Sequence, residues 1–317
     1  MQIVPTKVVW MDGKLVPWDQ ATIHVASHVI HYASSVFSGG RCYRRANGDP
    51  VGFRLYDHAK RLVDSCKLTL MADQLPYSVD DIYHAIIQTI EANGLVPCYI
   101  RPVIYRGYGE LGVMSRNCPV NMFILIQDWG SYLGDRPARV MVSSRRRPRS
   151  DSMFMGAKTG ANYQPGQYMK NLATMLGFDE AIALTEDGLV SEGSGENIFM
   201  VRDGVLYTPD LASSVLGGIM RDTVITLARD LGIEVREQRI PPEFLYTSDE
   251  VFFTGSAAEI TPIGLVDTTP IDQTPGNITT LIRRSLFGII NGPDVEGQPG
   301  WMTRHGGWLT SLNLATE

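Results

Sequence analysis

The chain has 317 residues, of which 44% are hydrophobic and 20% are charged, which is ordinary for a globular protein with a core of normal size. Its net charge of −6 argues against general nucleic-acid binding, because a surface that follows phosphates needs an excess of Lys and Arg. The four cysteines are widely spaced and form no C-x-x-C pair, which predicts free thiols in a reducing compartment rather than a disulfide scaffold or a metal site.

The start of the chain lacks the basic stretch and apolar segment of a secretory leader, and no run of about 18 apolar residues occurs. We therefore expect a cytoplasmic protein with no membrane partner. The length predicts two domains, or one large one. We expect a small N-terminal α/β domain over residues 1–128 and a larger domain over residues 138–317. The connector at residues 129–137 is rich in glycine and turn-forming residues.

The first domain is expected to combine a hairpin with further strands and two helices. Val8–Met11 and Lys14–Val16 flank an Asp12-Gly13 turn, which is a strong hairpin signal. Apolar residues at helical spacing follow Asp57, which suits the N-cap position of a helix. The elements expected after the hairpin are strands at Val36–Arg44 and Val51–Arg54, helices at Asp57–Leu70 and Val79–Ala92, and strands at Cys98–Tyr105 and Asn121–Asp128.

The second domain is expected to alternate strands and helices. The basic run Arg145–Arg149 is interpreted mainly as a solvated loop, with attraction of anionic substrates as the alternative. The tail after Asn291 carries Trp301 and Trp308 and is a candidate for docking on the surface. The expected strands are Arg139–Ser143, Ala181–Leu184, Asn197–Arg202, Val205–Tyr207 and Val251–Thr254, and the expected helices are about Gln164–Leu176, Gly218–Leu231 and Asn277–Ile290.

Lys158 is the candidate reactive amine. An amine that attacks a carbonyl must be neutral, and apolar surroundings favour the neutral form. The small and apolar residues of Phe154–Ala161 would remove water from Lys158. A lysine taken alone is more often a surface charge, so Lys158 gains weight only from the motifs that follow it.

Those motifs supply an acid and an anion site. Glu192 lies in the run Ser191–Asn197, where a carboxylate can keep a pyridine nitrogen protonated and so stabilise a carbanion through the ring. Gly217-Gly218 opens an amphipathic helix whose first N–H groups can bind a phosphate. Each motif alone also fits an ordinary turn. Together with the amine, they describe a pocket for pyridoxal phosphate (PLP).

Taken together and in order, the motifs resemble the class IV (fold type IV) PLP-dependent aminotransferases, and within them the branched-chain amino-acid aminotransferases. The resemblance extends from about Val9 to Ile290. It implies an α/β (α+β) fold with a small N-terminal α/β domain and a larger pseudo-barrel domain. The stretches that carry it are His31–Phe37, Phe53–Leu62, Tyr99–Pro102, Trp129–Gly134, Ala157–Tyr163, Ser191–Asn197 and Ser256–Pro262.

The resemblance also implies roles for individual residues. Lys158 would be the catalytic residue, which forms a Schiff base with PLP and then shuttles the proton between Cα and C4′. No metal is implied. The implied cofactor-binding residues are Arg61, Lys158, Tyr163, Glu192, Leu216, Gly218, Ile219, Met220 and Ser256. The implied substrate-binding residues are Tyr32, Phe37, Gly39, Tyr99, Arg101, Trp129, Tyr132, Ser256 and Ala257.

Within the substrate set, Arg101 with Tyr32 would bind the distal carboxylate of glutamate, so that one pocket accepts both leucine-like and glutamate side chains. Family members are at least homodimers, and the resemblance implies that residues 107–116 and the region of Tyr32 complete a neighbouring site. The expected partners are therefore amino acids, 2-oxo acids and at least one further copy of the chain.

The chain departs from the family pattern near the substrate pocket. The family usually has Val-Phe-Glu-Gly-Ile-Arg, whereas this chain has Ser38 and Gly40 in place of the acid and the isoleucine. Met220 stands where threonine is usual, and Arg106 adds a charge in an unusual loop. These departures can alter which amine donor is accepted, but they leave the Schiff-base chemistry in place.

We therefore predict transamination of L-branched-chain amino acids with 2-oxoglutarate by a ping-pong mechanism. The alternative is a class IV transaminase of altered specificity, selective for (R)-amines or D-amino acids. An activity like that of aminodeoxychorismate lyase is disfavoured, because Arg101 and Tyr132 suit a dicarboxylate acceptor. A PLP-binding scaffold without turnover is disfavoured because both Lys158 and Glu192 are present.

Overall fold

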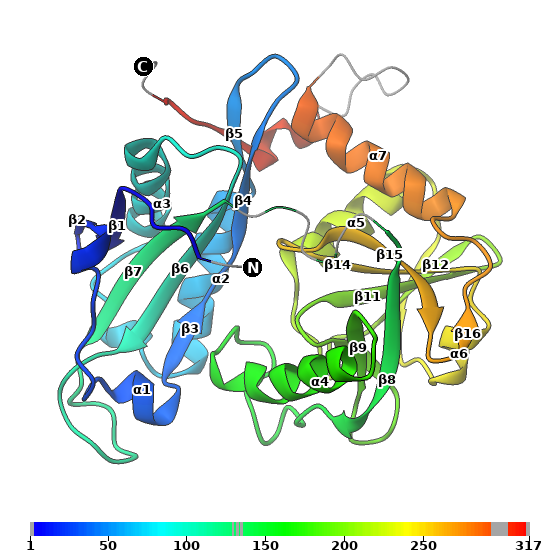
Figure 1. Cartoon of the computed structure of the whole chain (residues 1–317), viewed down its shortest axis with the longest axis horizontal. Coiled ribbons are helices and arrows are strands. Elements are labelled where there is room, and N and C mark those ends of the chain that lie inside the picture. The colour runs from blue at the N-terminus through cyan, green and yellow to red at the C-terminus, as the bar shows by residue number, and fades with distance from the viewer. Residues whose placement is uncertain (1–2, 129, 131–132, 134–135, 293–303, 315–317) are drawn as a thin grey trace. The chain divides into compact units, whose positions relative to one another are not determined.

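The computed structural model describes residues 3–128, 130, 133, 136–292 and 304–314. The chain forms two compact units (Figure 1). Unit 1 contains Met1–Gly130, Ala157–Ala161 and Gly288–Glu317, and unit 2 contains Ser131–Gly156 and Asn162–Phe287. Both units mix helices and strands, as the sequence predicts. Among the described residues, no helix is long and apolar enough to cross a membrane.

Unit 1 contains a largely antiparallel sheet with the strand order β17-β5-β4-β6-β7-β1-β2, and β3 pairs with β6. The predicted hairpin is confirmed, because Val8–Met11 pairs with Lys14–Pro17 around the Asp12-Gly13 turn. The elements of this unit are β1 (Val8–Met11), β2 (Lys14–Pro17), η1 (Trp18–Gln20), α1 (His28–Tyr32), β3 (Ser35–Phe37), β4 (Gly40–Arg44), β5 (Pro50–Phe53), α2 (Leu55–Leu68), η2 (Ala72–Gln74), α3 (Val79–Asn93), β6 (Cys98–Arg106), β7 (Val120–Gln127), η4 (Gly306–Trp308) and β17 (Leu309–Ser311).

Helices α2 and α3 pack against each other and against this sheet. Their apolar faces bury Leu62, Ile86 and Ile90 together with Ile104 and Ile124 of the sheet. Full burial of one such side chain stabilises the fold by about 1.5–3 kcal/mol, so the periodic apolar residues decide which face of each helix turns inward. The Ser78 hydroxyl caps α3 by accepting a hydrogen bond from the Asp81 N–H at 3.1 Å.

Two predictions for unit 1 are wrong in detail. The strand expected over Val36–Arg44 is interrupted, because the Ser38 N–H donates to the Pro102 carbonyl at 3.0 Å and β4 begins only at Gly40. Helix α2 begins at Leu55 with Arg54 at the N-cap position, not Asp57. Asp57 instead lies in the first turn, where its carboxylate accepts from the Arg54 guanidinium at 2.6 Å.

The C-terminal tail also joins unit 1. β17 pairs with β5, and the Trp308 carbonyl accepts a hydrogen bond from the Arg54 N–H. The expected docking of the tail is thus confirmed at Leu309–Ser311, whereas Trp301 lies outside the described residues. All four cysteines are buried and free in the structure.

Unit 2 contains a sheet with the order β10-β9-β8-β15-β14-β11-β12-β13, and β16 pairs with β15. The predicted strands are confirmed, but β10, β13, β15 and β16 were not expected from the sequence. The elements are β8 (Ala138–Arg146), η3 (Ala161–Tyr163), α4 (Gln164–Met175), β9 (Glu180–Leu184), β10 (Val190–Gly193), β11 (Asn197–Arg202), β12 (Val205–Pro209), α5 (Ile219–Asp230), β13 (Val235–Gln238), α6 (Glu243–Tyr246), β14 (Glu250–Gly255), β15 (Glu259–Val266), β16 (Thr269–Pro270) and α7 (Asn277–Asn291).

The helices of unit 2 cover its sheet at separate places. Helix α4 packs against β8 and β9, where Met169 and Ala173 meet Ala181 and Ala183. Helix α5 packs against β13 and β14. The small alanine side chains let α4 lie close to the sheet.

The run that contains Glu192 forms β10, which pairs with β9 at the edge of the same sheet. The motif around Glu192 therefore lies on a strand, not in a loop.

Candidate active site

Lys158 belongs by its contacts to unit 1, although it lies far along the chain from the rest of that unit. The Phe37 N–H donates to the Lys158 carbonyl at 2.9 Å, and the Gly160 N–H donates to the Ser35 carbonyl at 3.0 Å. On the other side, the Lys158 N–H donates to the Ser65 hydroxyl of α2 at 3.1 Å. Residues 157–161 thus lie alongside β3. The backbone of Lys158 is held by one hydrogen bond to β3 and by another to Ser65 of α2.

The side chain of Lys158 lies against a cluster of predicted substrate residues. Its ammonium group is 4.9 Å from the centre of the Phe37 ring, and the Arg101 guanidinium is 4.8 Å from the same ring. Arg101 also donates to the Tyr99 hydroxyl at 3.0 Å. A side chain on Gly39 would collide with that hydroxyl, so glycine is required for Tyr99 to lie where it does.

Arg61 lies on α2, one turn after His58, and it donates to the Ser38 hydroxyl at 3.0 Å. The Ser65 hydroxyl, which receives the Lys158 N–H, donates in turn to the Arg61 carbonyl at 2.9 Å. Unit 1 therefore brings the candidate amine and the candidate phosphate-binding guanidinium onto one connected framework of α2, β3 and residues 157–161.

Tyr32 lies on α1 and is tied to the loop after β6. Its hydroxyl accepts from the Gly112 N–H at 3.1 Å, and the His28 ring stacks on it at 4.6 Å between centroids. The Tyr32 side chain stays 44% exposed. Two further predicted substrate residues, Trp129 and Tyr132, lie outside the described residues.

Arg106, which the sequence marks as an added charge in an unusual loop, does not present that charge to a substrate. It is fully buried and donates to the Leu70 carbonyl at 2.8 Å and the Cys118 carbonyl at 3.0 Å, and also to the Gln74 side chain. Burial lowers the pKa of its guanidinium, with nearby Arg116 adding to the shift. Arg106 thus fastens the ends of the loop at residues 107–118, so this departure does not favour altered specificity.

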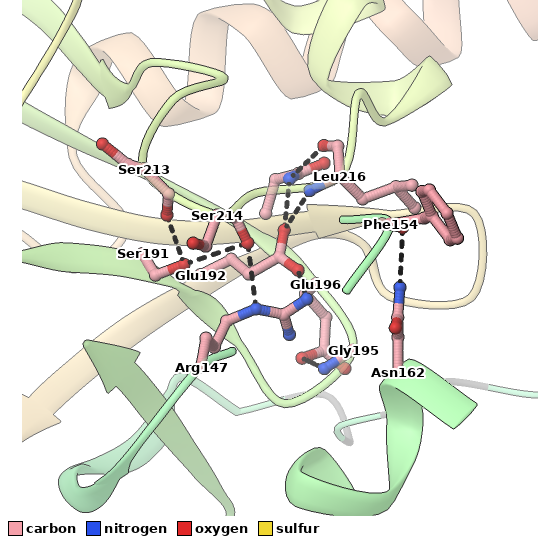
Figure 2. A network of polar contacts seen from close by, with 11 residues as sticks. Arg147, Phe154, Asn162, Ser191, Glu192, Gly195, Glu196, Ser213, Ser214 and Leu216 are labelled. Atoms are coloured by element: carbon pink, nitrogen blue, oxygen red, sulfur yellow. Dashed lines mark hydrogen bonds and ion pairs between the residues drawn. The ribbon is translucent and has the colours of Figure 1, made fainter. Parts of the chain in front are cut away.

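In unit 2, Glu192 is the centre of a buried polar network (Figure 2). One carboxylate oxygen accepts from the Asn197 side chain at 2.9 Å and from the Leu216 N–H at 3.0 Å. The other pairs with the Arg147 guanidinium at 2.9 Å. These three donors fix the orientation of the acid and favour its ionised form, which is the form that can accept a hydrogen bond from a protonated ring nitrogen.

Arg147 is the site residue that the sequence interpretation missed. The basic run was expected to be a solvated loop, but β8 continues through Arg145 and Arg146, and the Arg147 side chain is only 7% exposed. Its Nε also donates to the Ser214 carbonyl at 3.0 Å, as Figure 2 shows. A buried charge needs a partner. One signal in the sequence could have indicated Arg147: the acid Glu192 was expected inside the protein, and no cation had been assigned to pair with it.

The turn before α5 has the geometry of an anion cradle. Helix α5 begins at Ile219 with Gly218 as its N-cap, and the N-terminus of a helix carries a partial positive charge and directs its first N–H groups out of the helix end. A side chain on Gly218 would collide with the Asn197 side chain, whose Nδ2 also donates to the Leu216 carbonyl at 2.9 Å. The turn is thereby joined to Glu192. Met220 is buried, and its side chain offers no hydroxyl to a phosphate.

Tyr163 and the Ser256-Ala257 turn lie near the same run. A side chain on Gly195 would lie 3.7 Å from the Tyr163 ring, so this ring lies beside the turn after Glu192. Asn197 pairs with Thr254, which places the turn after β14 at the Glu192 end of the sheet.

Phe154, expected to shield Lys158, is 56% exposed, and its carbonyl accepts from the Asn162 side chain at 3.0 Å.

Glu196 is a second buried acid beside Glu192. Burial raises the pKa of its carboxyl to about 8, Glu180 and Glu192 add to the shift, and the Gly195 N–H at 3.1 Å and Lys170 oppose it. Glu180 already has Lys170 as its partner at 3.0 Å, and Glu192 has Arg147. The raised pKa of Glu196 favours its protonated form, whereas the guanidinium of Arg147 beside Glu192 favours a charged Glu192.

These residues fit PLP by the chemistry of their donor sets. Unit 1 carries an anchored amine together with a guanidinium. Unit 2 carries a fixed carboxylate for a ring nitrogen and a helix N-terminus of the kind that binds phosphate, where the glycine lets the Asn197 side chain approach the turn.

Comparison with known proteins agrees with this chemistry. The family described as amino-transferase class IV matches residues 36–266. The branched-chain-amino-acid aminotransferase of Escherichia coli (strain K12) is 41% identical over 311 residues, which cover 96% of this chain and 97% of that protein. The Escherichia coli crystal structure of that enzyme has a TM-score of 0.91 at 40% identity and covers 97% of this chain and 100% of its own.

A second solved structure is a form with the cofactor bound. The branched-chain amino acid aminotransferase of Thermobaculum terrenum, in its PLP-form (holo-form), has a TM-score of 0.89 at 34% identity. The match covers 98% of this chain and 99% of that one. The family and this structure together support PLP as the cofactor of the chain.

Proposed function

The chain belongs to the class IV aminotransferases, and we propose that it transfers the amino group of L-branched-chain amino acids to 2-oxoglutarate in two half-reactions, with PLP as cofactor. The observation that carries the proposal is the cluster in unit 1, where Lys158, Phe37, Arg101 and Tyr99 lie against one another. The amine for the chemistry and the groups for a substrate side chain thus occupy the same place.

When bound, PLP supplies an electron-withdrawing ring that stabilises negative charge at the substrate Cα. Lys158 would hold the cofactor covalently and then carry the proton between Cα and C4′. Glu192, fixed by Arg147 and Asn197, would accept a hydrogen bond from the ring nitrogen. The further cofactor-binding residues in this proposal are Arg61, Tyr163, Leu216, Gly218, Ser256 and the backbone of Ile219 and Met220.

The substrate side chain would meet an apolar ring and a cation at one place. Phe37 offers a ring face, and Arg101 lies over the same ring and bonds the Tyr99 hydroxyl. A leucine side chain can pack on the ring, while the distal carboxylate of glutamate can pair with Arg101. Gly39, Ala257 and Tyr32 complete the proposed substrate set among the described residues.

The test is the absorbance of the PLP-loaded protein during titration, in turn, with L-leucine, D-alanine and (R)-1-phenylethylamine. We expect L-leucine to convert the cofactor to its pyridoxamine form fastest, because the Phe37 ring can pack against its apolar side chain and the similar proteins are branched-chain-amino-acid aminotransferases. Conversion by D-alanine or the (R)-amine alone would overturn the substrate assignment and leave the cofactor assignment standing. A protein that binds no PLP would overturn both.

We also propose that the protein works as a homodimer or a higher homo-oligomer. Helix α1 and the loop after β6 lie side by side (Figure 1), joined by the bonds of Tyr32 and His28 to Gly112. These two segments and the residues just before α1 carry many exposed apolar side chains, a feature typical of protein–protein interfaces. These exposed residues are Ile23, Val25, Ile30, Tyr32, Tyr108, Leu111, Val113 and Met114. A second copy of the chain is the partner that the family membership favours.

Sedimentation velocity measures this assembly. We expect the protein to sediment as a dimer or larger, and Val113→Asp to shift it towards the monomer, because the Val113 side chain is 91% exposed in the single chain and a charge there opposes burial. Met175→Asp is the matched control, since Met175 is also exposed but lies in the last turn of α4, in unit 2. A monomeric wild-type protein would contradict the proposal.

A further inference from the structure

Ser38 lies at 0% exposure between two side chains of α2. Its hydroxyl oxygen is 3.0 Å from the Arg61 guanidinium and 3.0 Å from Nδ1 of His58. The backbone fixes this position, because the Ser38 N–H donates to the Pro102 carbonyl and the preceding Phe37 N–H donates to the Lys158 carbonyl. The Ser38 hydroxyl therefore links Arg61 to His58. It belongs to the same short segment whose Phe37 bonds the Lys158 backbone.

The direction of the first of these hydrogen bonds follows from which groups can donate. A guanidinium has no acceptor, so Ser38 accepts from Arg61 and keeps its own proton. A neutral His58 ring with its proton on Nε2 accepts that proton at Nδ1, the other neutral tautomer donates from Nδ1 to the same hydroxyl, and neither form adds a charge beside Ser38. Burial lowers the pKa of His58 well below its usual value, and Arg61, Lys158 and Arg54 lower it further. The bridge is thus a neutral one between a cation and an uncharged ring.

We propose that Ser38 and His58 are positioning residues that aim Arg61 at the phosphate of PLP. The inference rests on the proposed function, in which Arg61 binds that phosphate. A long guanidinium side chain loses rotamer freedom when it binds, and a partner that fixes it beforehand reduces this cost. Because Ser38 carries no charge, it fixes Arg61 without offsetting the charge that attracts the phosphate.

A comparison of PLP with pyridoxal, which lacks the phosphate, isolates this effect. Apo-protein prepared from the holoenzyme is titrated with each compound, and binding is followed by absorbance. We expect Ser38→Ala to weaken PLP binding by about tenfold, the typical value of one lost hydrogen bond, and to change pyridoxal binding by less than about twofold. Thr89→Val is the control, because it also removes a fully buried hydroxyl from unit 1 but lies on α3.

The variant Arg61→Gln separates the inference from the proposed function. We expect it to weaken PLP binding by about 10- to 100-fold with little effect on pyridoxal, and we expect Ser38→Ala to add nothing in its presence. If Arg61→Gln leaves PLP binding unchanged, the phosphate role of Arg61 and the inference both fail. If Arg61→Gln weakens PLP binding and Ser38→Ala does not, or if Ser38→Ala weakens PLP and pyridoxal equally, only the inference is overturned.

A second variant tests the neutral bridge without depending on the cofactor. In Ser38→Glu a carboxylate would face His58, and an adjacent opposite charge favours the protonated ring. Proton NMR of the histidine rings between about pH 5 and pH 8 reports that change. We expect the pKa of His58 to be higher in Ser38→Glu than in the wild type, where burial and the neighbouring cations lower it. An unchanged pKa of His58 in Ser38→Glu would overturn the inference.

Discussion

Lys158→Ala will lower the turnover of L-leucine with 2-oxoglutarate by about 10⁴-fold or more, because the variant loses both the covalent attachment of PLP and the group that carries the proton. The fold is expected to survive. The bonds that hold residue 158 to Ser65 and Phe37 come from its backbone, and alanine keeps them.

Steady-state turnover and the absorbance of bound PLP together measure this result. Lys67→Ala is the matched control, since Lys67 is 63% exposed and pairs with the exposed Asp64. The control is expected to retain wild-type turnover and the absorbance of covalently bound PLP. Substantial turnover by Lys158→Ala would refute the assignment of the catalytic amine.

Arg147→Gln will destabilise the protein by about 3–5 kcal/mol, because it leaves the charge of Glu192 buried without its cation. The two side chains are 7% and 6% exposed and 2.9 Å apart, so water does not replace the lost partner. The Ser214 carbonyl also loses the Nε donor. Both losses occur inside unit 2, beside the acid proposed to contact the cofactor ring.

Calorimetric unfolding of the apo-protein measures this change, and Arg146→Gln is the control from the neighbouring position. Arg146 is exposed, so its replacement is expected to change stability by no more than about 0.5 kcal/mol. Glu192→Gln and the double variant complete a cycle in which the double variant should recover part of the loss. Equal stability of Arg147→Gln and Arg146→Gln would contradict a structural role for the buried pair.

The sequence predicted most elements of the fold correctly where the signal is local. The Asp12-Gly13 turn and the apolar residues at helical spacing after Ser78 each act within a few residues, and β1, β2 and α3 appear where expected. Helix α5 was also expected close to its observed bounds, because Gly217-Gly218 and the apolar face define it locally. The interruption at Ser38 was missed because it depends on Pro102, which is far away in the sequence.

The candidate chemistry was likewise readable from the sequence at Lys158 and Glu192, since the spacing of amine, acid and glycine turn is a property of the chain order. The contacts that support these groups were not. Arg147 was taken for a surface charge because a run of arginines is usually solvated, and only the approach of β8 to β10 through β9 brings it to Glu192.

The sequence by itself identified the candidates for the amine and the acid and pointed to PLP, because motif spacing is a property of chain order, and the class of the fold followed from the family resemblance that these motifs carry. Only the tertiary structure decided that residues 157–161 pair with β3, that Arg106 and Arg147 are buried, and that Ser38 connects Arg61 to His58. The physical reason is that burial of a charge is favourable only with a partner, and each of these partners is brought near by strand pairing and helix packing between distant parts of the chain.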